Sequence, residues 1–130
     1  GPDAMASPAD RKYSKTHEWH KFEGDALTLG VTKFAVDALT DITYVQMKPV
    51  GTKFAAGGIV GEVESVKTTS DIYSAVAGEI TAVNSALMDN PGLMNSDPFG
   101  AGWLLKIKVS DQSGASGLLD SAKYDAEIAH

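Results

Sequence analysis

The chain has 130 residues and a mass of 13.6 kDa, which is the size of a single domain. Its 11 basic and 17 acidic residues give a formal net charge of −6, whereas binding to nucleic-acid phosphates requires a basic surface. Cysteine is absent, which excludes disulfides, thiolate metal sites and thiol nucleophiles encoded in the chain. The three histidines are scattered and no apolar run could span a bilayer, so we expect no metal, nucleic acid or membrane as a partner.

The beginning of the chain is expected to lie outside the folded domain. Residues 1–5 read Gly-Pro-Asp-Ala-Met, which resembles a cloning remnant before a native methionine, and the rest of residues 1–11 is expected to be a flexible N-terminus. Residues 12–130 are then a single domain. Neither a secretory segment nor an arginine-rich transit peptide is found, so we expect a cytoplasmic location in a bacterium, or the mitochondrial matrix for a mature eukaryotic form.

Short β-strands separated by glycine and turn residues dominate the pattern along the chain. Strands are expected at residues 26–31, 42–47, 59–66, 70–73, 79–83 and 103–109. After the first of these strands, Thr32 is expected to cap a short helix over residues 33–39. The helix is expected to bury the side that carries Phe34, Ala38 and Leu39.

The last part of the chain combines one clear strand with a helix. Apolar residues alternate with other residues from Trp103 to Val109, which predicts a half-buried strand with Trp103 in the core. Residues 110–117 are small and polar and predict a loop. A C-terminal helix is expected from Leu118, with Ser121 as its cap. Several short strands and a terminal helix predict a β-rich barrel or sandwich.

A six-residue pattern occurs twice. Residues 61–66 and 78–83 both read glycine, acid, aliphatic, any residue, small residue, valine. Coincidence between two β-strands would explain so short a match, and two quasi-equivalent strands of a pseudo-symmetric sheet pair would explain it equally. Lys67 follows the first copy directly, in the turn before the next strand.

Motifs for catalysis are missing from the sequence. It contains no Gly-x-Ser-x-Gly nucleophile elbow and no glycine-rich phosphate loop between a strand and a helix. Lys67 occupies the tip of a predicted hairpin, but taken alone it is one of ten lysines, and exposed lysines mostly keep a surface hydrated. The residues by themselves therefore give little support to an enzymatic function.

The segment Glu64-Ser65-Val66-Lys67 is followed by Ser70-Asp71-Ile72-Tyr73 and by Gly78-Glu79-Ile80. Before this segment come Thr16-His17-Glu18-Trp19, Leu29-Gly30-Val31-Thr32 and Gly51, which is sixteen residues before the lysine. After it come Asn90-Pro91-Gly92-Leu93 and Gly102-Trp103. In order and spacing these segments resemble the H-protein family of the glycine cleavage system, from about Lys12 to Tyr124. The chain departs from the family at Thr68, where alanine is usual, at Ala75, where proline is frequent, and at Thr40, where glycine is frequent.

The resemblance implies a fold and a cofactor. The fold is mainly β, a barrel-sandwich hybrid of the lipoyl-domain type with antiparallel sheets, a short helix near Thr32 and a C-terminal helix. Lys67 is implied to carry lipoic acid as N6-lipoyllysine. The amide removes the lysine charge and adds a long apolar arm that ends in a strained dithiolane.

The resemblance also implies a function and partners. The protein would be a carrier without catalysis of its own, moving an aminomethyl group from a pyridoxal-phosphate-dependent glycine decarboxylase, the P protein, to a tetrahydrofolate-dependent aminomethyltransferase, the T protein. Dihydrolipoamide dehydrogenase, the L protein, would then reoxidise the dithiol. A lipoate ligase or octanoyltransferase would modify the chain, which is expected to be a monomer.

Three groups of residues are expected to serve the arm. Glu64, Ser65, Val66 and Gly78 are expected to form the segment that the modifying enzyme recognises. Glu18 and Asp71 are hypothesised to line a cleft that shields the loaded arm from water. The alternative is that both are solvated acids on the surface. His17 is open to two interpretations, an acid–base group or a residue that stabilises the N-terminal strand.

Alternative functions remain on the sequence alone. One is a relay that passes octanoyl or lipoyl groups to other lipoyl proteins. A second is a biotin carrier, but that family flanks its lysine with methionines, whereas Lys67 stands between Val66 and Thr68. A third is an unmodified β-domain that binds proteins, in which Lys67 is ordinary.

Overall fold

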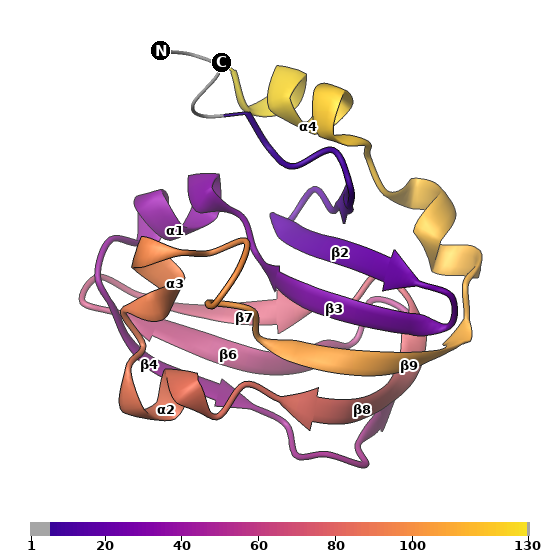
Figure 1. Cartoon of the computed structure of the whole chain (residues 1–130), viewed down its shortest axis with the longest axis horizontal. Helices are drawn as coiled ribbons and strands as arrows, with labels where there is room; N and C mark the ends of the chain where they lie inside the picture. The colour runs from indigo at the N-terminus through magenta and orange to yellow at the C-terminus, as the bar shows by residue number, and fades with distance from the viewer. Residues whose placement is uncertain (1–5, 130) are drawn as a thin grey trace.

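The computed structural model describes residues 6–129 (Figure 1). The larger antiparallel sheet has the strand order β1-β2-β3-β9-β8-β5, and the smaller has the order β4-β6-β7. The strands are β1 Lys12–Tyr13, β2 Glu18–Glu23, β3 Ala26–Val31, β4 Ile42–Met47, β5 Lys53–Phe54, β6 Ile59–Ser65, β7 Thr69–Tyr73, β8 Ala77–Val83 and β9 Leu105–Asp111. The helices are α1 Lys33–Leu39, α2 Ala86–Asp89, α3 Leu93–Ser96 and α4 Ser121–Ile128, with a 3₁₀-helix at Ser113–Gly117.

The expected mainly β barrel-sandwich hybrid with antiparallel sheets is confirmed, and so are the helix after Thr32 and the C-terminal helix. One apolar cluster joins the inner faces of both sheets. It includes Leu29 and Ile107 of the larger sheet and Val63 and Ile72 of the smaller, all of which are buried. Burial of each such side chain contributes about 1.5–3 kcal/mol, so this cluster is what holds the sheets face to face.

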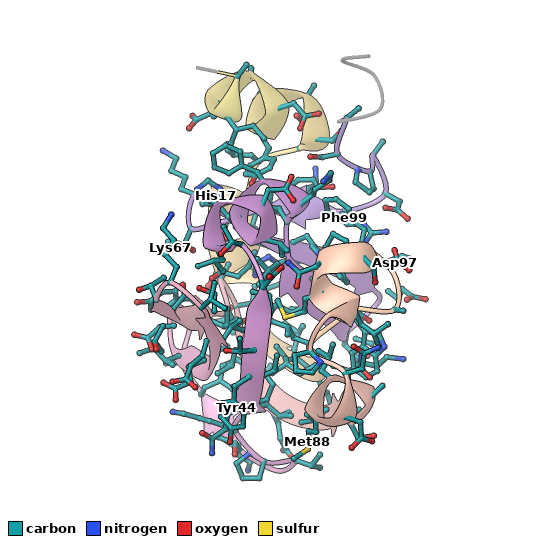
Figure 2. The ribbon with its side chains drawn as sticks, turned by 90° about the vertical axis from the view of Figure 1, so that its left-hand side faces the viewer. His17, Tyr44, Lys67, Met88, Asp97 and Phe99 are labelled. Carbon is teal, nitrogen blue, oxygen red and sulfur yellow. The ribbon has the colours of Figure 1, made fainter. Side chains whose placement is uncertain are left out.

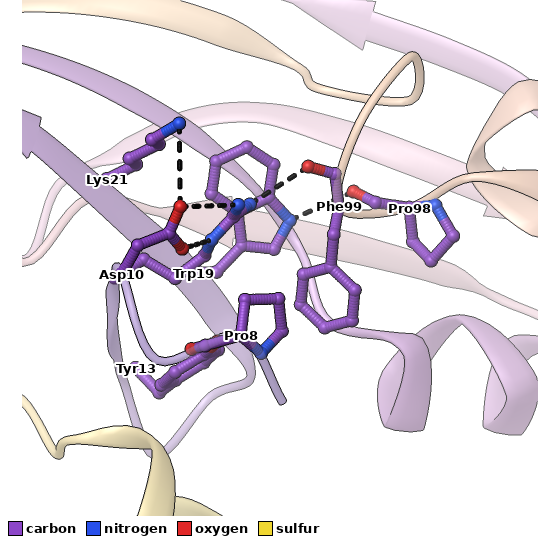
Figure 3. Close-up of polar contacts among 8 residues, drawn as sticks. Pro8, Asp10, Tyr13, Trp19, Lys21, Pro98 and Phe99 are labelled. Carbon is purple, nitrogen blue, oxygen red and sulfur yellow. Dashed lines mark hydrogen bonds and ion pairs between the residues drawn. The ribbon is translucent and has the colours of Figure 1, made fainter. Parts of the chain in front are cut away.

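A second, smaller cluster lies on the other side of the larger sheet, under α4. Tyr13, Trp19 and Tyr124 are buried in it, and the rings of the two tyrosines stack with centroids 4.7 Å apart. Figure 3 shows two segments that close this cluster. The Trp19 indole donates to the Pro98 carbonyl, in the loop after α3, at 3.0 Å, and the Tyr13 hydroxyl donates to the Pro8 carbonyl, in the chain before β1, at 2.6 Å.

Residues 7–11, expected to belong to a flexible N-terminus, make defined contacts. The Arg11 guanidinium lies 4.6 Å from the Trp19 ring centroid and donates to the Phe99 carbonyl at 2.9 Å. The Ser7 hydroxyl donates to Asp125 of α4 at 2.7 Å. Residues 1–5, which contain the expected cloning remnant and Met5, lie outside the described residues.

The end of the chain differs from its prediction in three details. Asp120, and not Ser121, caps α4, because its carboxylate accepts the Lys123 backbone N–H at 2.8 Å. The predicted polar loop contains a 3₁₀-helix, and its first two residues extend β9. Trp103 precedes β9 and is only half-buried against the second cluster, with the Lys106 ammonium 5.3 Å from its ring.

The repeated six-residue pattern lies in two strands of different sheets, β6 and β8. Each copy begins with a glycine beside an irregularity in strand pairing. A Cβ on Gly61 would lie 2.7 Å from the Gln46 carbonyl, and one on Gly78 would lie 2.4 Å from the Lys108 carbonyl. Both glycines thus let a neighbouring strand approach closely, which supports quasi-equivalent positions for the two strands.

Candidate functional site

Lys67 lies in the turn of the β6–β7 hairpin, as the sequence predicts. Glu64 and Thr69 form the last strand pair, and the Ser65 N–H donates to the Thr68 carbonyl at 2.8 Å. The Ser65 hydroxyl accepts the backbone N–H groups of Lys67 and Thr68, both at 3.1 Å. A serine that accepts from two following amides fixes a tight turn, so the backbone of Lys67 is held while its side chain projects from the edge of the molecule (Figure 2).

The hairpin turn is also tied to the end of α1. The Lys67 ammonium donates to the Ala38 carbonyl at 3.2 Å, and the Val66 N–H donates to the Asp41 carbonyl at 3.1 Å. Carbonyls in the last turn of a helix lack partners within the helix and carry partial negative charge, which suits an ammonium group. The free lysine therefore leans over the space between the turn and α1.

That space is a cavity of about 300 Å³ that is open on one side. Its lining residues are Thr16, His17, Glu18, Val31, Phe34, Ala35, Ala38, Leu39, Lys67, Thr68, Ser70, Asp71 and Ile72. The expected burial of Phe34, Ala38 and Leu39 on α1 is confirmed only for Leu39, which is half-buried and packs against the main core cluster. Phe34 is 43% exposed and Ala38 is also exposed, because both lie at the open cavity, and Val36 is the residue that α1 buries fully.

Glu18 is the buried acid of the cavity, with 2% of its surface exposed. One carboxylate oxygen accepts the hydroxyls of Ser14, at 2.7 Å, and Thr16, and the other accepts the Tyr73 N–H at 3.2 Å. Burial raises the pKa of Glu18 in spite of these donors. Glu18 is therefore not a solvated surface acid.

Asp71 lines the same cavity but lies on the exposed side of β7, directly opposite Glu62 of β6. The structure thus brings Lys67, Glu18 and Asp71 around one cavity, although they come from a turn and two different sheets. A buried carboxyl and an exposed one offer an amine-bearing group two acceptors of different strength.

His17 connects the cavity to the C-terminal helix. Its Nδ1 lies 2.8 Å from the Tyr124 hydroxyl, which lies 2.7 Å from the Thr32 hydroxyl at the start of α1. Burial lowers the pKa of His17 and raises the pKa of Tyr124 to about 12. His17 thus lines the cavity and also contacts α4 through Tyr124, while its role as an acid–base group stays a prediction. No sequence signal pointed to Tyr124 or Thr32 in these contacts.

The segment expected for recognition is divided between two places. Glu64 and Val66 are exposed at the hairpin, and Ser65 shapes its turn. Gly78 does not join them, because it lies buried in β8 of the larger sheet, where it admits β9. The close approach of β9 therefore accounts for a glycine at this position, eleven residues after Lys67.

The three departures from the family pattern lie at separate places. Thr68 is exposed beside Lys67, with its hydroxyl turned to the Thr69 carbonyl at 3.4 Å. Ala75 donates its N–H to His20 at 3.1 Å. Thr40 ends α1 with φ +65° and ψ −146°, a conformation that glycine adopts readily and that strains a β-branched residue.

Within residues 6–129, no group of three or more acidic or histidine side chains is placed to hold a metal ion, and no helix is long and apolar enough to cross a membrane. What the fold does present is a lysine on a rigid hairpin turn beside an open, largely apolar cavity. Two antiparallel sheets that carry a lysine in this way define a carrier domain of the lipoyl type.

Comparisons with known proteins assign this carrier to a family. The family model described as "Glycine cleavage H-protein" matches residues 11–130. The chain is 49% identical over 120 residues to a glycine cleavage system H protein of Thermus thermophilus, and 45% identical over 120 residues to one of Methylacidiphilum infernorum, with 92% of this chain and 94% of each relative covered. The crystal structure of an H protein from Mycobacterium marinum superimposes with a TM-score of 0.87 at 37% identity, covering 95% of this chain and all of that one. The chain belongs to the glycine cleavage H-protein family.

Proposed function

We propose that Lys67 carries lipoate as an amide on Nζ and that the chain shuttles this arm among the enzymes of a glycine cleavage system. Membership of the family makes the chain a lipoyl carrier of that system. The observation that carries the assignment to Lys67 is its position: it lies exposed on a turn that Ser65 fixes, beside the cavity. An enzyme can surround such a lysine without unfolding any strand.

The residues around Lys67 fit a lipoyl arm. Phe34, Leu39 and Ile72 give the cavity an apolar wall for the hydrocarbon part of the arm, and Glu18 and Asp71 supply acceptors at its polar side. When bound, lipoate supplies a dithiol–disulfide couple, which the cysteine-free chain lacks. Conversion of the ammonium to an amide removes the charge that now contacts the Ala38 carbonyl, so α1 holds the modified side chain less strongly than the free lysine.

We further propose that Glu18 and Asp71 protect the aminomethyl cargo. The cargo ends in an ammonium group, which two carboxylates stabilise, and the apolar wall from α1 limits the approach of water. The chain itself performs no chemistry in this proposal. Its partners are the decarboxylase, the aminomethyltransferase, dihydrolipoamide dehydrogenase and a lipoate ligase or octanoyltransferase.

A reconstituted glycine cleavage assay tests this function. Enzymatically lipoylated wild-type protein is expected to support glycine-dependent NADH formation with the three partner enzymes, whereas Lys67→Arg keeps the charge and is expected to give none. Lys48→Arg, at an exposed lysine after β4, is the matched control and is expected to behave like wild type. Turnover supported by Lys67→Arg would reject Lys67 as the attachment site.

A further inference from the structure

The strand that leads away from Lys67 has an open edge. β7 is the outer strand of the smaller sheet, so every second backbone N–H along it lacks a partner strand. The Ser74 N–H points inward and donates to the Gly58 carbonyl at 3.1 Å. The amides of Tyr73 and Ala75, on either side of it, therefore point outward from the sheet.

Two side chains of β2 accept these outward amides. The Tyr73 N–H donates to Glu18 Oε2 at 3.2 Å, and the Ala75 N–H donates to His20 Nε2 at 3.1 Å. Alternate residues of a strand share one face, so Glu18 and His20 have the same spacing as the two amides that they meet. Trp19 between them points to the opposite face and into the second cluster. Side chains of one sheet thus take the place of a neighbouring strand for the other.

The hydrogen bonds of the His20 ring determine its tautomer. Because Nε2 accepts an N–H, it carries a lone pair, and the proton of the neutral ring lies on Nδ1, which is 3.3 Å from the Glu18 carbonyl. His20 is fully buried, and burial lowers its pKa to about 4, so the ring stays neutral at physiological pH. Every polar atom of the ring therefore has a partner, and the imidazole has one orientation.

We propose that Glu18 and His20 are positioning residues, a cross-sheet clamp on the last residue of β7 and the segment that follows it, which sets the place of the Lys67 hairpin for the enzymes that modify and reload it. The inference rests on the proposed function for the role of Lys67, but the clamp itself does not depend on lipoate. Ala75 supplies the N–H that His20 accepts. A proline, which the family often has at this position, has no N–H to donate, so in this chain the buried histidine occurs together with a residue that can donate.

Amide hydrogen exchange tests the clamp directly. Replacing His20 by Phe removes the acceptor for Ala75, and replacing Glu18 by Met removes the acceptor for Tyr73. Each variant is expected to speed exchange roughly tenfold at its own amide, beyond the change at Leu105 in the core strand β9. His20→Gln restores an acceptor and is expected to restore protection of Ala75. Trp19→Phe, on the opposite face of β2, is expected to change exchange at both amides no more than it changes exchange at Leu105.

The clamp also predicts a kinetic signature. With lipoate ligase, His20→Phe is expected to raise the KM for the carrier about fivefold while kcat changes less than about twofold, because the hairpin is displaced and the chemistry is not. His20→Gln is expected to restore the KM.

Three results would overturn the clamp: exchange at Tyr73 and Ala75 that only follows Leu105, an unchanged KM in His20→Phe, or ¹⁵N NMR of wild-type protein that places the His20 proton on Nε2. The NMR measurement needs no variant and therefore decides even if His20→Phe does not fold. Failure to lipoylate the wild-type chain would instead reject the proposed function and leave the exchange result intact.

Discussion

Glu18 and Asp71 line one cavity but differ in their surroundings. Glu18 is buried and already accepts two hydroxyls and one backbone amide, whereas Asp71 is exposed beside Glu62. A carboxylate has about four acceptor positions, so Glu18 retains one for a group in the cavity. The pair therefore combines a buried acid held by three hydrogen bonds with an exposed, hydrated one.

Changing Glu18 to Gln and Asp71 to Asn together is expected to shorten the lifetime of the aminomethyl-loaded protein about tenfold, because the ammonium end of the cargo loses two charged acceptors. Release of ammonia from the loaded protein over time measures this lifetime. Glu62→Gln is the matched control, since Glu62 lies opposite Asp71 but outside the cavity. If the double variant keeps the wild-type lifetime, the two acids do not protect the cargo.

Helix α1 illustrates how an element's role depends on what lies beside it. Its apolar residues serve two surroundings: Val36 is buried in the main core, whereas Phe34, Ala38 and Leu39 line the cavity next to Lys67. At its end, Thr40 holds the strained conformation described above, and the Asn95 side chain donates to the Thr40 carbonyl at 2.9 Å. The end of α1 is thus fixed from outside the helix, close to the Ala38 carbonyl that meets the lysine.

Thr40→Gly is expected to stabilise the protein by about 1 kcal/mol. Backbone strain at a non-glycine residue in this region costs about 1–3 kcal/mol, and glycine loses about 0.5–1 kcal/mol through the greater freedom of the unfolded chain. Thermal unfolding measures the change as a rise in Tm of roughly 3 °C. Thr40→Ala keeps the Cβ and is expected to gain much less. Equal gains from both substitutions would show that the side chain of Thr40, and not its backbone conformation, destabilises the protein.

The sequence predicts most strands because their patterns are local. Alternation from Leu105 to Val109 is enough to place β9, and glycine breaks place its neighbours. The sequence places the cap of α4 one residue late. Aspartate and serine are both favoured at this position, so the local pattern does not decide between Asp120 and Ser121. The predicted buried face of α1 omits Val36 and includes Phe34 and Ala38, which line the cavity, because local amphipathicity does not distinguish a core from a cavity.

The candidate site is less predictable than the strands for a related reason. Lys67 and its hairpin follow from turn residues and from the family resemblance. Glu18 and His20, by contrast, are polar and would normally be expected on the surface. They are buried because they accept the amides of Tyr73 and Ala75, more than fifty positions away, and that requirement exists only once the two sheets meet.

At the scale of the whole molecule, stability must respond to acid through the buried histidine. The pKa of His20 is about 4 in the folded protein against 6.5 as its ordinary value. Between these values the unfolded chain binds the proton more readily, so the free energy of unfolding falls as the pH falls from 6.5 towards 4. Glu18 acts in the opposite direction, because its raised pKa lets the folded state take up a proton first.

His20→Gln is expected to make the loss of stability on acidification shallower, by up to about 1.4 kcal/mol per pH unit, because it removes one titrating group and keeps both hydrogen bonds. Urea unfolding at several pH values between about 6.5 and 4 measures the slope for each protein. Since Glu18 is present in both, its contribution cancels in the difference. Parallel slopes for the two proteins would mean that His20 does not stay neutral in the folded state.

The central claim is that a single lysine carries the lipoyl arm. The most direct measurement is peptide mapping by mass spectrometry of the protein after treatment with lipoate ligase, lipoate and ATP. The expected result is one lipoyl group on the peptide that contains Lys67, with the other nine lysines unmodified and no modification of Lys67→Arg. A lipoyl group on another lysine, or an unmodified chain under conditions that modify a known H protein, would contradict the claim.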